Sequence, residues 1–382
     1  MSPKRPAAGG ESCKARSYFI NGMVSDHMIH EGTADDRGHE LPGELFFLES
    51  VKYLGKPRGN IMRMIAIIKK CLESEKELIL SSVEKEDTVL FFDNEEELLR
   101  SKDCENVEIV LGEPKPSTIH AMKHLRWIQM TWAGANQYTS APDFPKHIVL
   151  TSASGAYGCV ISEYIVCGIL TLIKKLFSYR EQMKNGGWNK IEGDDTLEGK
   201  RVLILGTGNI GQETAKKLKC FGADTVGICR SACNEKLFFD EIYTIDSVDI
   251  ELQKADVVVI ALPGTAETAG MFDAERIKKM KANAILVNVG RGFIVDTDEL
   301  TNALEKGLLR GAVLDVTEPE PLPEKHPLRY MENVLLTPHV SGIGWGDNLF
   351  TRKRILDIFC ENMKRDRNNT PKMNRIDFSK GY

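Results

Sequence analysis

An α/β protein with two parallel sheets is the fold class that the sequence predicts. Its 382 residues suffice for about two domains at roughly 150 residues each. Short apolar runs alternate with helical patterns over two stretches of the chain, which is typical of parallel sheets covered by helices. The second stretch opens on a glycine-rich turn between a strand and a helix. We therefore expect two Rossmann-like or flavodoxin-like sheets.

The composition excludes several classes of protein. A net charge of -5 and a pI of about 6.0 give no reason to expect nucleic acid as a partner. The nine cysteines include no CxxC pair, so we expect neither a disulfide framework nor a metal site. The most apolar stretch, "CVISEYIVCGILTLIKKL", contains Glu163 and is too short to span a bilayer cleanly, and no signal peptide is recognisable. These features predict a soluble, cytoplasmic protein that does not bind membranes.

Residues 1–61 differ from the rest of the chain. Glycine and proline recur, and no strand or helix period persists, so we expect this extension to be largely disordered. A targeting peptide is the rival interpretation, but such peptides are poor in acids and this segment is not. An extended gene model is the simpler alternative, because "MRMIAIIKK" from Met62 resembles a normal first strand.

The elements follow in order from Met62. The first series, residues 62–154, includes the apolar runs "TVLFF" and "VEIVLGE" and the helical patterns "NEEELLRSK" and "STIHAMKHLRW". A long helix is predicted over residues 159–180. The strands of the second series are "RVLILG", "TVGICR", "EIYTI", "VVVIAL", "AILVNVG", "GAVLDV" and "NVLLT", and their continuous apolar character predicts burial on both faces. A final helix is predicted over residues 347–365.

The glycine turn lies in "VLILGTGNIGQETAKKL", where Gly206, Gly208 and Gly211 have GxGxxG spacing. The first glycine makes the tight turn, the second lets the backbone approach a pyrophosphate, and the third lets the helix pack against the strand. The N-terminus of the following helix supplies unpaired N–H groups for the phosphates. Asn209 and Ile210, which lie between the glycines, belong to the same predicted dinucleotide site.

The end of the next strand decides between the two nicotinamide cofactors. An acid there would hold the ribose 2′-hydroxyl of NAD, but the residue is Cys229, followed by Arg230 and Ser231. A guanidinium and a hydroxyl suit a 2′-phosphate. We therefore favour NADP(H) and regard NAD(H) as possible. The alternative is that Arg230 is a solvated surface charge.

Three polar residues end or follow strands of the second series: Arg291 in "VNVGRGFIVD", Glu320 in "VLDVTEPEPLP" and His339 in "LLTPHVSG". Ligands of open α/β sheets bind beyond the carboxyl ends of the strands. Reduction of a 2-oxo acid needs a cation for the carboxylate, a proton donor for the carbonyl oxygen and an acceptor that orients the donor. The three residues match these needs, although each alone is more often structural.

These motifs resemble the D-isomer-specific 2-hydroxyacid dehydrogenases, and in particular their glyoxylate/hydroxypyruvate reductase-like branch. The similarity extends from about Met62 to the C-terminus and includes "TLEGKRVLILGTGNIGQETAKKLKCFGA", "ILVNVGRGFIVDTDELTNAL", "GAVLDVTEPEPLP" and "NVLLTPHVSG". The resemblance implies a cofactor domain, residues 156–342, inserted in a discontinuous substrate domain, residues 62–155 and 343–382. It also implies a homodimer built through the cofactor domains.

The resemblance further assigns roles to individual residues. It makes Arg291, Glu320 and His339 the catalytic set, with His339 as proton donor or acceptor, and places the substrate carboxylate on Arg291 and on the backbone of "WAGAN". The substrate residues of that loop are Ala133, Gly134 and Ala135, and the further cofactor residues are Pro263, Thr268, Val289 and Asp315. Gly264 departs from the bulkier residue expected beside Pro263. The glycines of "SGAYG", residues 154–158, suit a hinge.

The predicted function is interconversion of a 2-oxo acid and a D-2-hydroxy acid by hydride transfer to or from the nicotinamide. A nicotinamide-sensing, corepressor-like interaction protein is the alternative from another class, because such proteins resemble this family and retain the three catalytic residues. Formate dehydrogenase is less attractive, since that branch carries a glutamine where Glu320 stands. The sequence does not name the acid.

Overall fold

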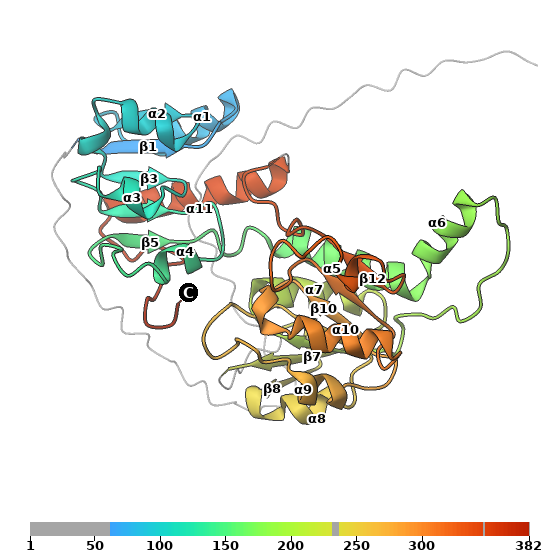
Figure 1. Cartoon of the computed structure of the whole chain (residues 1–382). Coiled ribbons are helices and arrows are strands. Elements are labelled where there is room, and N and C mark those ends of the chain that lie inside the picture. Colours follow the sequence, from blue (N-terminus) through green and yellow to red (C-terminus); the bar gives the residue numbers. More distant parts are fainter. Residues whose placement is uncertain (1–61, 231–236, 347, 382) are drawn as a thin grey trace, which may run out of the picture. The chain divides into compact units, whose positions relative to one another are not determined.

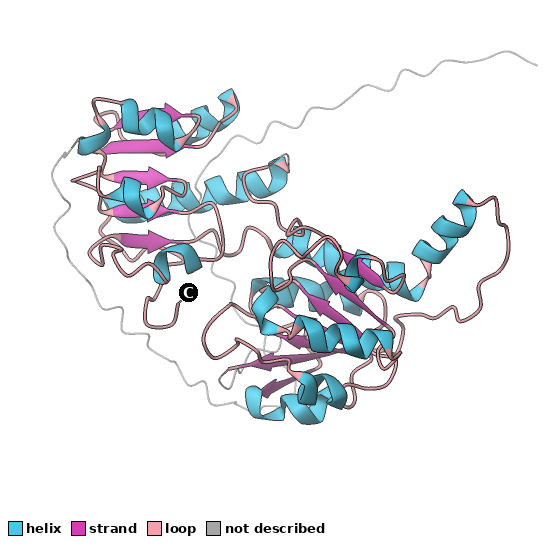
Figure 2. Cartoon of the chain, in the orientation of Figure 1, coloured by secondary structure: helices cyan, strands magenta, loops and turns pink. Residues whose placement is uncertain are grey.

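The computed structural model describes residues 62–230, 237–346 and 348–381. These residues form one parallel sheet of five strands and one of seven, with helices on both faces of each sheet (Figure 1, Figure 2). The predicted α/β fold class is confirmed. The predictions for residues 1–61 and for Ser231 lie outside the described residues.

The five-stranded sheet has the strand order β2-β1-β3-β4-β5, and all neighbouring strands are parallel. Its strands are β1 Met64–Ile68, β2 Thr88–Phe92, β3 Ile109–Leu111, β4 Trp127–Gln129 and β5 Val149–Thr151. Its own helices are α1 Glu73–Ser81, α2 Glu95–Arg100, η1 Cys104–Asn106, α3 Pro116–Ile119 and α4 Asn136–Thr139.

The last long helix, α11 (Leu349–Arg367), returns to this first sheet. Its side chains Leu356, Phe359 and Met363 recur at helical spacing and are buried together with Ile65 and Trp127 of the sheet. The rings of Trp127 and Phe359 stack with centroids 5.9 Å apart. The first sheet is therefore built from two segments distant in the sequence (Figure 1).

The seven-stranded sheet has the order β12-β11-β10-β9-β6-β7-β8 and is also parallel throughout. Its strands are β6 Arg201–Leu205, β7 Asp224–Cys229, β8 Glu241–Thr244, β9 Val257–Ile260, β10 Ile285–Asn288, β11 Gly311–Leu314 and β12 Val334–Leu336. The helices are α5 Gly158–Ile173, α6 Leu176–Lys184, α7 Asn209–Lys219, α8 Val248–Leu252, α9 Ala274–Lys279 and α10 Thr297–Glu305, with short 3₁₀ turns η2 Ile245–Ser247, η3 Gly292–Ile294 and η4 Pro327–Arg329. The strand order reverses between β9 and β6, where a ligand is expected.

Burial on both faces explains the continuous apolar strands. In β9, Val257 and Val259 belong to one buried cluster, while Val258 and Ile260 belong to the other. Successive side chains of a strand point to opposite faces, so a strand covered on both faces is apolar at every position.

The predicted single helix over residues 159–180 is wrong, because the structure breaks it into α5 and α6. Lys175, between them, has the left-handed φ of 53°. The buried face of α5 ends at Ile173, and α6 buries no residue at all. Lys174 lies next to the break and donates to Asp194 at 3.1 Å. No glycine or proline marks the break in the sequence.

Two other helix predictions need smaller corrections. The helical pattern over residues 117–127 gives only α3, which ends at Ile119, and Trp127 already belongs to β4. The final helix begins at Leu349 rather than at residue 347, because the side chain of Asn348 caps it by accepting from the N–H groups of Phe350 and Thr351.

No helix within the described ranges is both long and apolar enough to cross a membrane. Within the same ranges, no group of three or more histidine, cysteine, aspartate or glutamate side chains is arranged to hold a metal ion.

Candidate active site

The three glycines of the nucleotide loop meet three different surroundings. Gly206 has φ 103°, and a Cβ on it would lie 2.6 Å from the carbonyl oxygen of Ala261. A Cβ on Gly211 would lie 2.0 Å from the carbonyl oxygen of Gly206. A Cβ on Gly208, by contrast, would meet no described atom within 4 Å. The first and third glycines are needed by the fold, and the second borders open space.

The N-terminus of α7 faces that open space. Gly208 is the N-cap and offers no side-chain cap, so the first-turn N–H groups remain available as donors. These groups and the helix dipole suit a pyrophosphate, and the residues present therefore fit the dinucleotide that the sequence predicts. Asn209 has a further task, because its Oδ1 accepts from the N–H of Gly158 at 3.0 Å. This contact ties the glycine loop to the start of α5.

The predicted 2′-phosphate residues follow β7. Cys229 ends the strand, and its thiol lies 3.4 Å from the carbonyl oxygen of Tyr243 as a donor. Arg230 follows at the carboxyl end of the strand, where the sequence places the cofactor ribose.

Arg291 is held by the turn that follows β10. The buried side chain of Asn288 donates to the carbonyl oxygen of Arg291 at 3.0 Å and accepts from the N–H of Gly290 at 3.1 Å. The guanidinium donates to the carbonyl oxygen of Gly290 at 2.7 Å. Burial lowers the pKa of Arg291, and the charge of Glu320 opposes this effect. Asn288 therefore holds the backbone of Arg291, a half-buried cation whose pKa is affected by the charge of Glu320.

The loop "WAGAN" contacts Arg291 through a glycine. A Cβ on Gly134 would lie 1.9 Å from Nη2 of Arg291, so the guanidinium occupies the space that a side chain would fill. The next contact is made by Asn136, whose Nδ2 donates to the carbonyl oxygen of Gly264 at 3.0 Å. The predicted substrate loop and the predicted substrate cation thus lie against each other.

Gly264 has a steric explanation in the structure. A Cβ there would lie 2.6 Å from Cζ of Phe293 and 2.7 Å from Cγ of Arg291. The bulkier residue expected from the resemblance would displace both side chains. Nearby, Thr268 donates from its hydroxyl to the carbonyl oxygen of Pro263 at 2.8 Å and so shapes this turn.

Glu320 and His339 form a pair. Nδ1 of His339 lies 2.8 Å from Oε1 of Glu320, and the two side chains are 48% and 41% exposed. His339 has a left-handed φ of 55°, which is strained for a residue other than glycine. Because Nδ1 is engaged by the carboxylate, Nε2 is the nitrogen left to act on a ligand.

Asp315 holds the backbone that presents His339. It is 1% exposed, and its Oδ1 accepts from Thr337 Oγ1 and from the N–H of Val340, each at 2.7 Å. Its Oδ2 accepts from the N–H of Ser341 at 3.0 Å and from the Ser341 hydroxyl. The N–H of His339 donates to the Asp315 carbonyl oxygen at 2.8 Å. All of the roughly four acceptor positions of this carboxylate are occupied within the chain.

A cleft of about 460 Å³ collects several of these residues. It is lined by the predicted residues Ala133, Gly134, Ala135, Gly208, Asn209, Ile210, Pro263, Val289 and Arg291, whereas Gly206, Gly211, Arg230, Thr268, Asp315, Glu320 and His339 do not line it. The predicted substrate loop, the N-terminus of α7 and the half-buried Arg291 therefore share one hollow.

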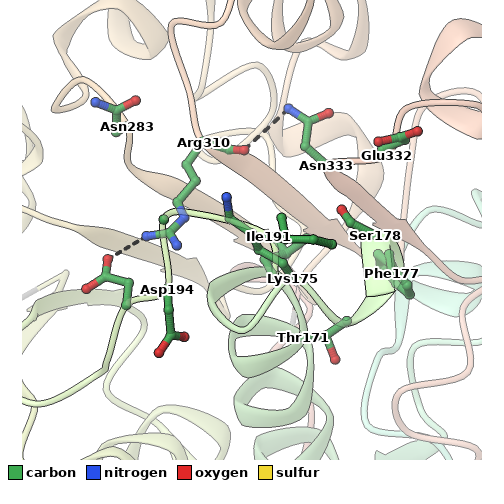
Figure 3. Close-up of a pocket in the computed structure, with 13 residues that line it drawn as sticks. Thr171, Lys175, Phe177, Ser178, Ile191, Asp194, Asn283, Arg310, Glu332 and Asn333 are labelled. Carbon is green, nitrogen blue, oxygen red and sulfur yellow. Dashed lines mark hydrogen bonds and ion pairs between the residues drawn. The ribbon is translucent and has the colours of Figure 1, made fainter. Parts of the chain in front are cut away.

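A second hollow, of about 560 Å³, lies at the opposite edge of the seven-stranded sheet (Figure 3). Asn283, Arg310 and Asn333 line it, and they precede β10, β11 and β12, whereas Arg291, Asp315 and His339 follow the same strands. Two of its charged side chains pair with each other, because Arg310 donates to Asp195 at 2.5 Å. Burial acts to raise the pKa of Asp195, but hydrogen bonds, including that from Arg310, hold it at about 2. We therefore take the first cleft, on the side of the sheet where the strands end, as the candidate ligand-binding hollow.

Sequence reasoning missed Asn136, Asn288 and the steric need for Gly264. It also missed the C-terminal segment, because Asn374 and Arg375 line the first cleft. The available signal for Asn288 was its position in the apolar strand "AILVNVG". An amide buried in such a strand needs hydrogen-bond partners, which suggests a structural task.

Comparison with known proteins agrees with these features. The D-isomer specific 2-hydroxyacid dehydrogenase, NAD binding domain, matches residues 166–341. A solved structure of a D-isomer specific 2-hydroxyacid dehydrogenase family protein from Aeromonas salmonicida is 32% identical, with a TM-score of 0.74, over 83% of this chain and 100% of that chain. The chain belongs to this family. The family predicted from the sequence is confirmed, and the protein is an NAD(P)-dependent oxidoreductase of the 2-hydroxyacid dehydrogenase family.

Two relatives indicate the breadth of this family. A glyoxylate reductase of Thermofilum pendens is 32% identical over 242 residues, which are 61% of this chain and 69% of that protein. A formate dehydrogenase of Neurospora crassa is 30% identical over 312 residues, which are 74% of this chain and 78% of that protein.

Proposed function

We propose that this 2-hydroxyacid dehydrogenase interconverts a small 2-oxo acid and the corresponding D-2-hydroxy acid, with His339 as proton donor and acceptor. The observation that carries the proposal is the pairing of His339 with Glu320 at 2.8 Å on segments that follow neighbouring strands of the sheet that bears Arg291. A cation, an imidazole and a carboxylate at the carboxyl edge of one parallel sheet suit an acid whose carbonyl is to be reduced.

Each residue has a defined task in the reaction. Arg291 donates to the substrate carboxylate, and the N–H groups of Ala133 to Ala135 donate to the same group. Bound nicotinamide supplies the hydride for reduction and accepts it for oxidation. Nε2 of His339 gives its proton to the carbonyl oxygen during reduction and takes it back during oxidation. Glu320 orients the ring through its contact with Nδ1.

In the proposal, each of the two sheets belongs to a domain that binds a different ligand. Residues 156–342 bind the dinucleotide, and residues 62–155 with 343–382 bind the substrate. Gly206, Gly208, Asn209, Ile210 and Gly211 hold the pyrophosphate at the start of α7. The remaining cofactor residues of the proposal are Arg230, Ser231, Pro263, Thr268, Val289, Asp315 and His339. The carboxamide role of Asp315 is the weakest member of this set, because its carboxylate already accepts four hydrogen bonds.

NADP(H) is the favoured cofactor, and NAD(H) is the alternative. The support is the absence of an acid at the end of β7, where Cys229 and Arg230 stand. Replacing Cys229 with Asp and Arg230 with Ala together should shift the cofactor preference toward NAD(H), and an unchanged NADPH:NADH ratio would rule out Arg230 as the determinant.

A homodimer built through the cofactor domains is part of the proposal. The helix α6 buries none of its residues, and its apolar side chains Leu176, Tyr179 and Met183 are 51%, 39% and 57% exposed. Trp188, which follows, is 96% exposed. A helix with this much exposed apolar surface suits contact with a second copy. A monomer by sedimentation velocity would contradict the dimer.

The deciding experiment measures NADPH and NADH consumption side by side with glyoxylate, hydroxypyruvate and phenylpyruvate. Glyoxylate is the first choice because one relative is a glyoxylate reductase. Hydroxypyruvate is added because the sequence resembles the glyoxylate/hydroxypyruvate reductase-like branch. Turnover that falls at least roughly 100-fold in His339→Ala supports the proposal. Tight cofactor binding without turnover of any of these acids would favour the corepressor-like alternative.

A further inference from the structure

Charge in the first cleft has one sign. Among the described residues that line it, Arg291 and Arg375 carry charge, and no aspartate, glutamate or lysine accompanies them. The whole chain, by contrast, has a net charge of -5. A hollow lined by two guanidinium groups in an acidic protein favours anionic ligands. Arg291 is engaged by its own turn and is proposed for the substrate carboxylate, so Arg375 needs a separate explanation.

The segment that carries Arg375 is firmly held. Residue Asn374 accepts through its carbonyl oxygen from the N–H of Ser152 at 3.0 Å, and its side chain donates to the carbonyl oxygen of Ser154 at 2.7 Å. Ile376 donates to Leu150 at 2.9 Å and is 7% exposed. The backbone on both sides of Arg375 is therefore anchored to the edge of the five-stranded sheet and to the first residues of the proposed hinge.

The same segment is also fixed from the core. The N–H of Met373 donates to Oδ1 of Asn362 at 2.7 Å, and Asn362 is 0% exposed. The ring of Phe378 stacks on Phe144 with centroids 5.3 Å apart. Asn374 adopts a left-handed φ of 54°, which bends the chain immediately before Arg375. The backbone of Arg375 therefore keeps a defined place, which the backbone of an arginine on a free terminus does not.

The guanidinium of Arg375 makes no hydrogen bond or ion pair with any of the described residues, although its neighbours on both sides are bonded. Residue Arg375 lines the same hollow as Gly208, Asn209 and Ile210 at the N-terminus of α7. That terminus is the proposed position of the pyrophosphate. A planar guanidinium binds phosphate through paired, charge-assisted hydrogen bonds.

We propose that Arg375 is a dinucleotide-binding residue, which donates to a phosphate of the cofactor from the C-terminal segment. This inference rests on the proposed NAD(P)-dependent function and extends it. The phosphate belongs either to the pyrophosphate, which both cofactors share, or to the 2′-position, which only NADP(H) carries. In either case the C-terminal segment becomes part of the cofactor site, and the cofactor is held from both sheets at once.

The test is a cofactor titration without substrate. Dissociation constants of NADPH and NADH are measured separately by nicotinamide fluorescence for the full-length wild type, Arg375→Ala and Arg375→Lys. The matched control is Arg100→Ala, which removes the same charge from an exposed position of α2, where Arg100 forms an ion pair with Glu96 at 3.5 Å. Thermal unfolding of each variant shows whether the fold is intact.

Arg375→Ala is expected to weaken binding about 10-fold or more, as for loss of a charge-assisted hydrogen bond, while Arg100→Ala has no effect. Arg375→Lys should retain part of the affinity, because it keeps the charge but not the planar fork. If the dissociation constants of NADPH and NADH rise equally, Arg375 contacts the pyrophosphate. If only that of NADPH rises, Arg375 contacts the 2′-phosphate. Binding in Arg375→Ala should also depend less on salt than in the wild type.

Three results would overturn the proposal, and they are distinguishable. Unchanged dissociation constants with normal turnover of a 2-oxo acid would remove Arg375 from the site and leave the proposed function intact. A higher KM for the 2-oxo acid with unchanged cofactor binding would assign Arg375 to the substrate instead. Failure of the wild type to bind either cofactor would overturn the proposed function together with this inference.

Discussion

Nδ1 of His339 lies 2.8 Å from Oε1 of Glu320, and this contact joins the segment after β12 to the segment after β11. The two strands are neighbours in the sheet, so the residues that follow them meet although 18 residues separate Glu320 from His339 along the chain. The strained left-handed backbone of His339 is held by Asp315. The pair is the basis of the first prediction.

Removal of the imidazole should abolish most of the catalysis. His339→Ala is expected to lower kcat by roughly 100-fold or more, because general acid–base catalysis contributes at least this much. Glu320→Gln keeps a hydrogen-bond acceptor beside Nδ1 but loses the charge, and a smaller loss of about 10-fold is expected. Steady-state kinetics of both variants, with cofactor binding measured separately, show whether the loss of kcat is larger in His339→Ala than in Glu320→Gln. Near wild-type turnover in His339→Ala would make the histidine structural.

Gly134 should act through Arg291. In Gly134→Ala the new Cβ would lie 1.9 Å from Nη2 of Arg291, and the end of that flexible side chain would move. The KM for the 2-oxo acid should rise about 10-fold or more, since a charge-assisted hydrogen bond is lost, with little change in the free energy of unfolding. The control is the same substitution in an Arg291→Ala background, where Gly134→Ala should have no further effect. If the effects of the two substitutions on KM are additive, Gly134 does not act through Arg291.

Two glycines of the nucleotide loop should respond in opposite ways. Gly208→Ala meets no described atom within 4 Å, so the free energy of unfolding should be nearly unchanged while the cofactor dissociation constant rises about 10-fold. Gly206→Ala forces an alanine to φ 103° and a Cβ to 2.6 Å from the carbonyl oxygen of Ala261. We expect it to lower the free energy of unfolding by about 3 kcal/mol. Urea unfolding and cofactor titration of both variants test this difference. Equal free energies of unfolding for Gly206→Ala and Gly208→Ala would contradict the prediction.

Asp315 holds the backbone of His339, and its substitution tests this role against the proposed contact with the carboxamide. Asp315→Asn places an amide where an oxygen accepted two hydrogen bonds, and the free energy of unfolding should fall by about 2 kcal/mol. We expect kcat to fall at least about 10-fold, because the His339 backbone shifts, whereas the NADPH dissociation constant changes little. Thr337→Val removes a single donor and should have a smaller effect. A large loss of NADPH affinity with normal kcat would instead support the carboxamide role.

Acid should weaken the attachment of α11. Burial acts to raise the pKa of Asp366, but hydrogen bonds from Arg126, at 2.8 Å, and Lys372 outweigh it and hold this pKa below its usual range. The contribution of Asp366 to stability is therefore present above its unfolded pKa and is lost as the pH falls through about 4 and below. Asp366→Asn should lower the free energy of unfolding at pH 7 by roughly 3 kcal/mol.

Urea unfolding at pH 7, 5 and 3 checks the sign. The difference between wild type and Asp366→Asn should be largest at pH 7 and shrink at pH 3. Asp357→Asn is the matched control on the same helix, because Asp357 is 49% exposed and pairs with the neighbouring Lys353. Its effect should stay below about 1 kcal/mol. A difference that grows toward acid pH would contradict the assignment.

The sequence by itself determined the fold class and the identity of the main candidate groups. Apolar strands such as β9 are readable because burial on both faces requires an apolar side chain at every position. The glycine loop can be recognised because Gly206 and Gly211 leave no room for a side chain, and Gly208 completes the spacing. Arg291, Glu320 and His339 are visible because polar side chains at the ends of parallel strands gather at one edge of a sheet.

Only the tertiary structure decided the contacts between segments distant in sequence. The break at Lys175, the space that Gly264 leaves for Arg291 and Phe293, and the four hydrogen bonds of Asp315 each depend on partners that no local pattern specifies. Arg375 is the clearest case, because its place in the cleft follows from backbone pairing with residues about 220 positions earlier in the chain. Periodicity reports which face of an element is buried, whereas packing decides what that face meets.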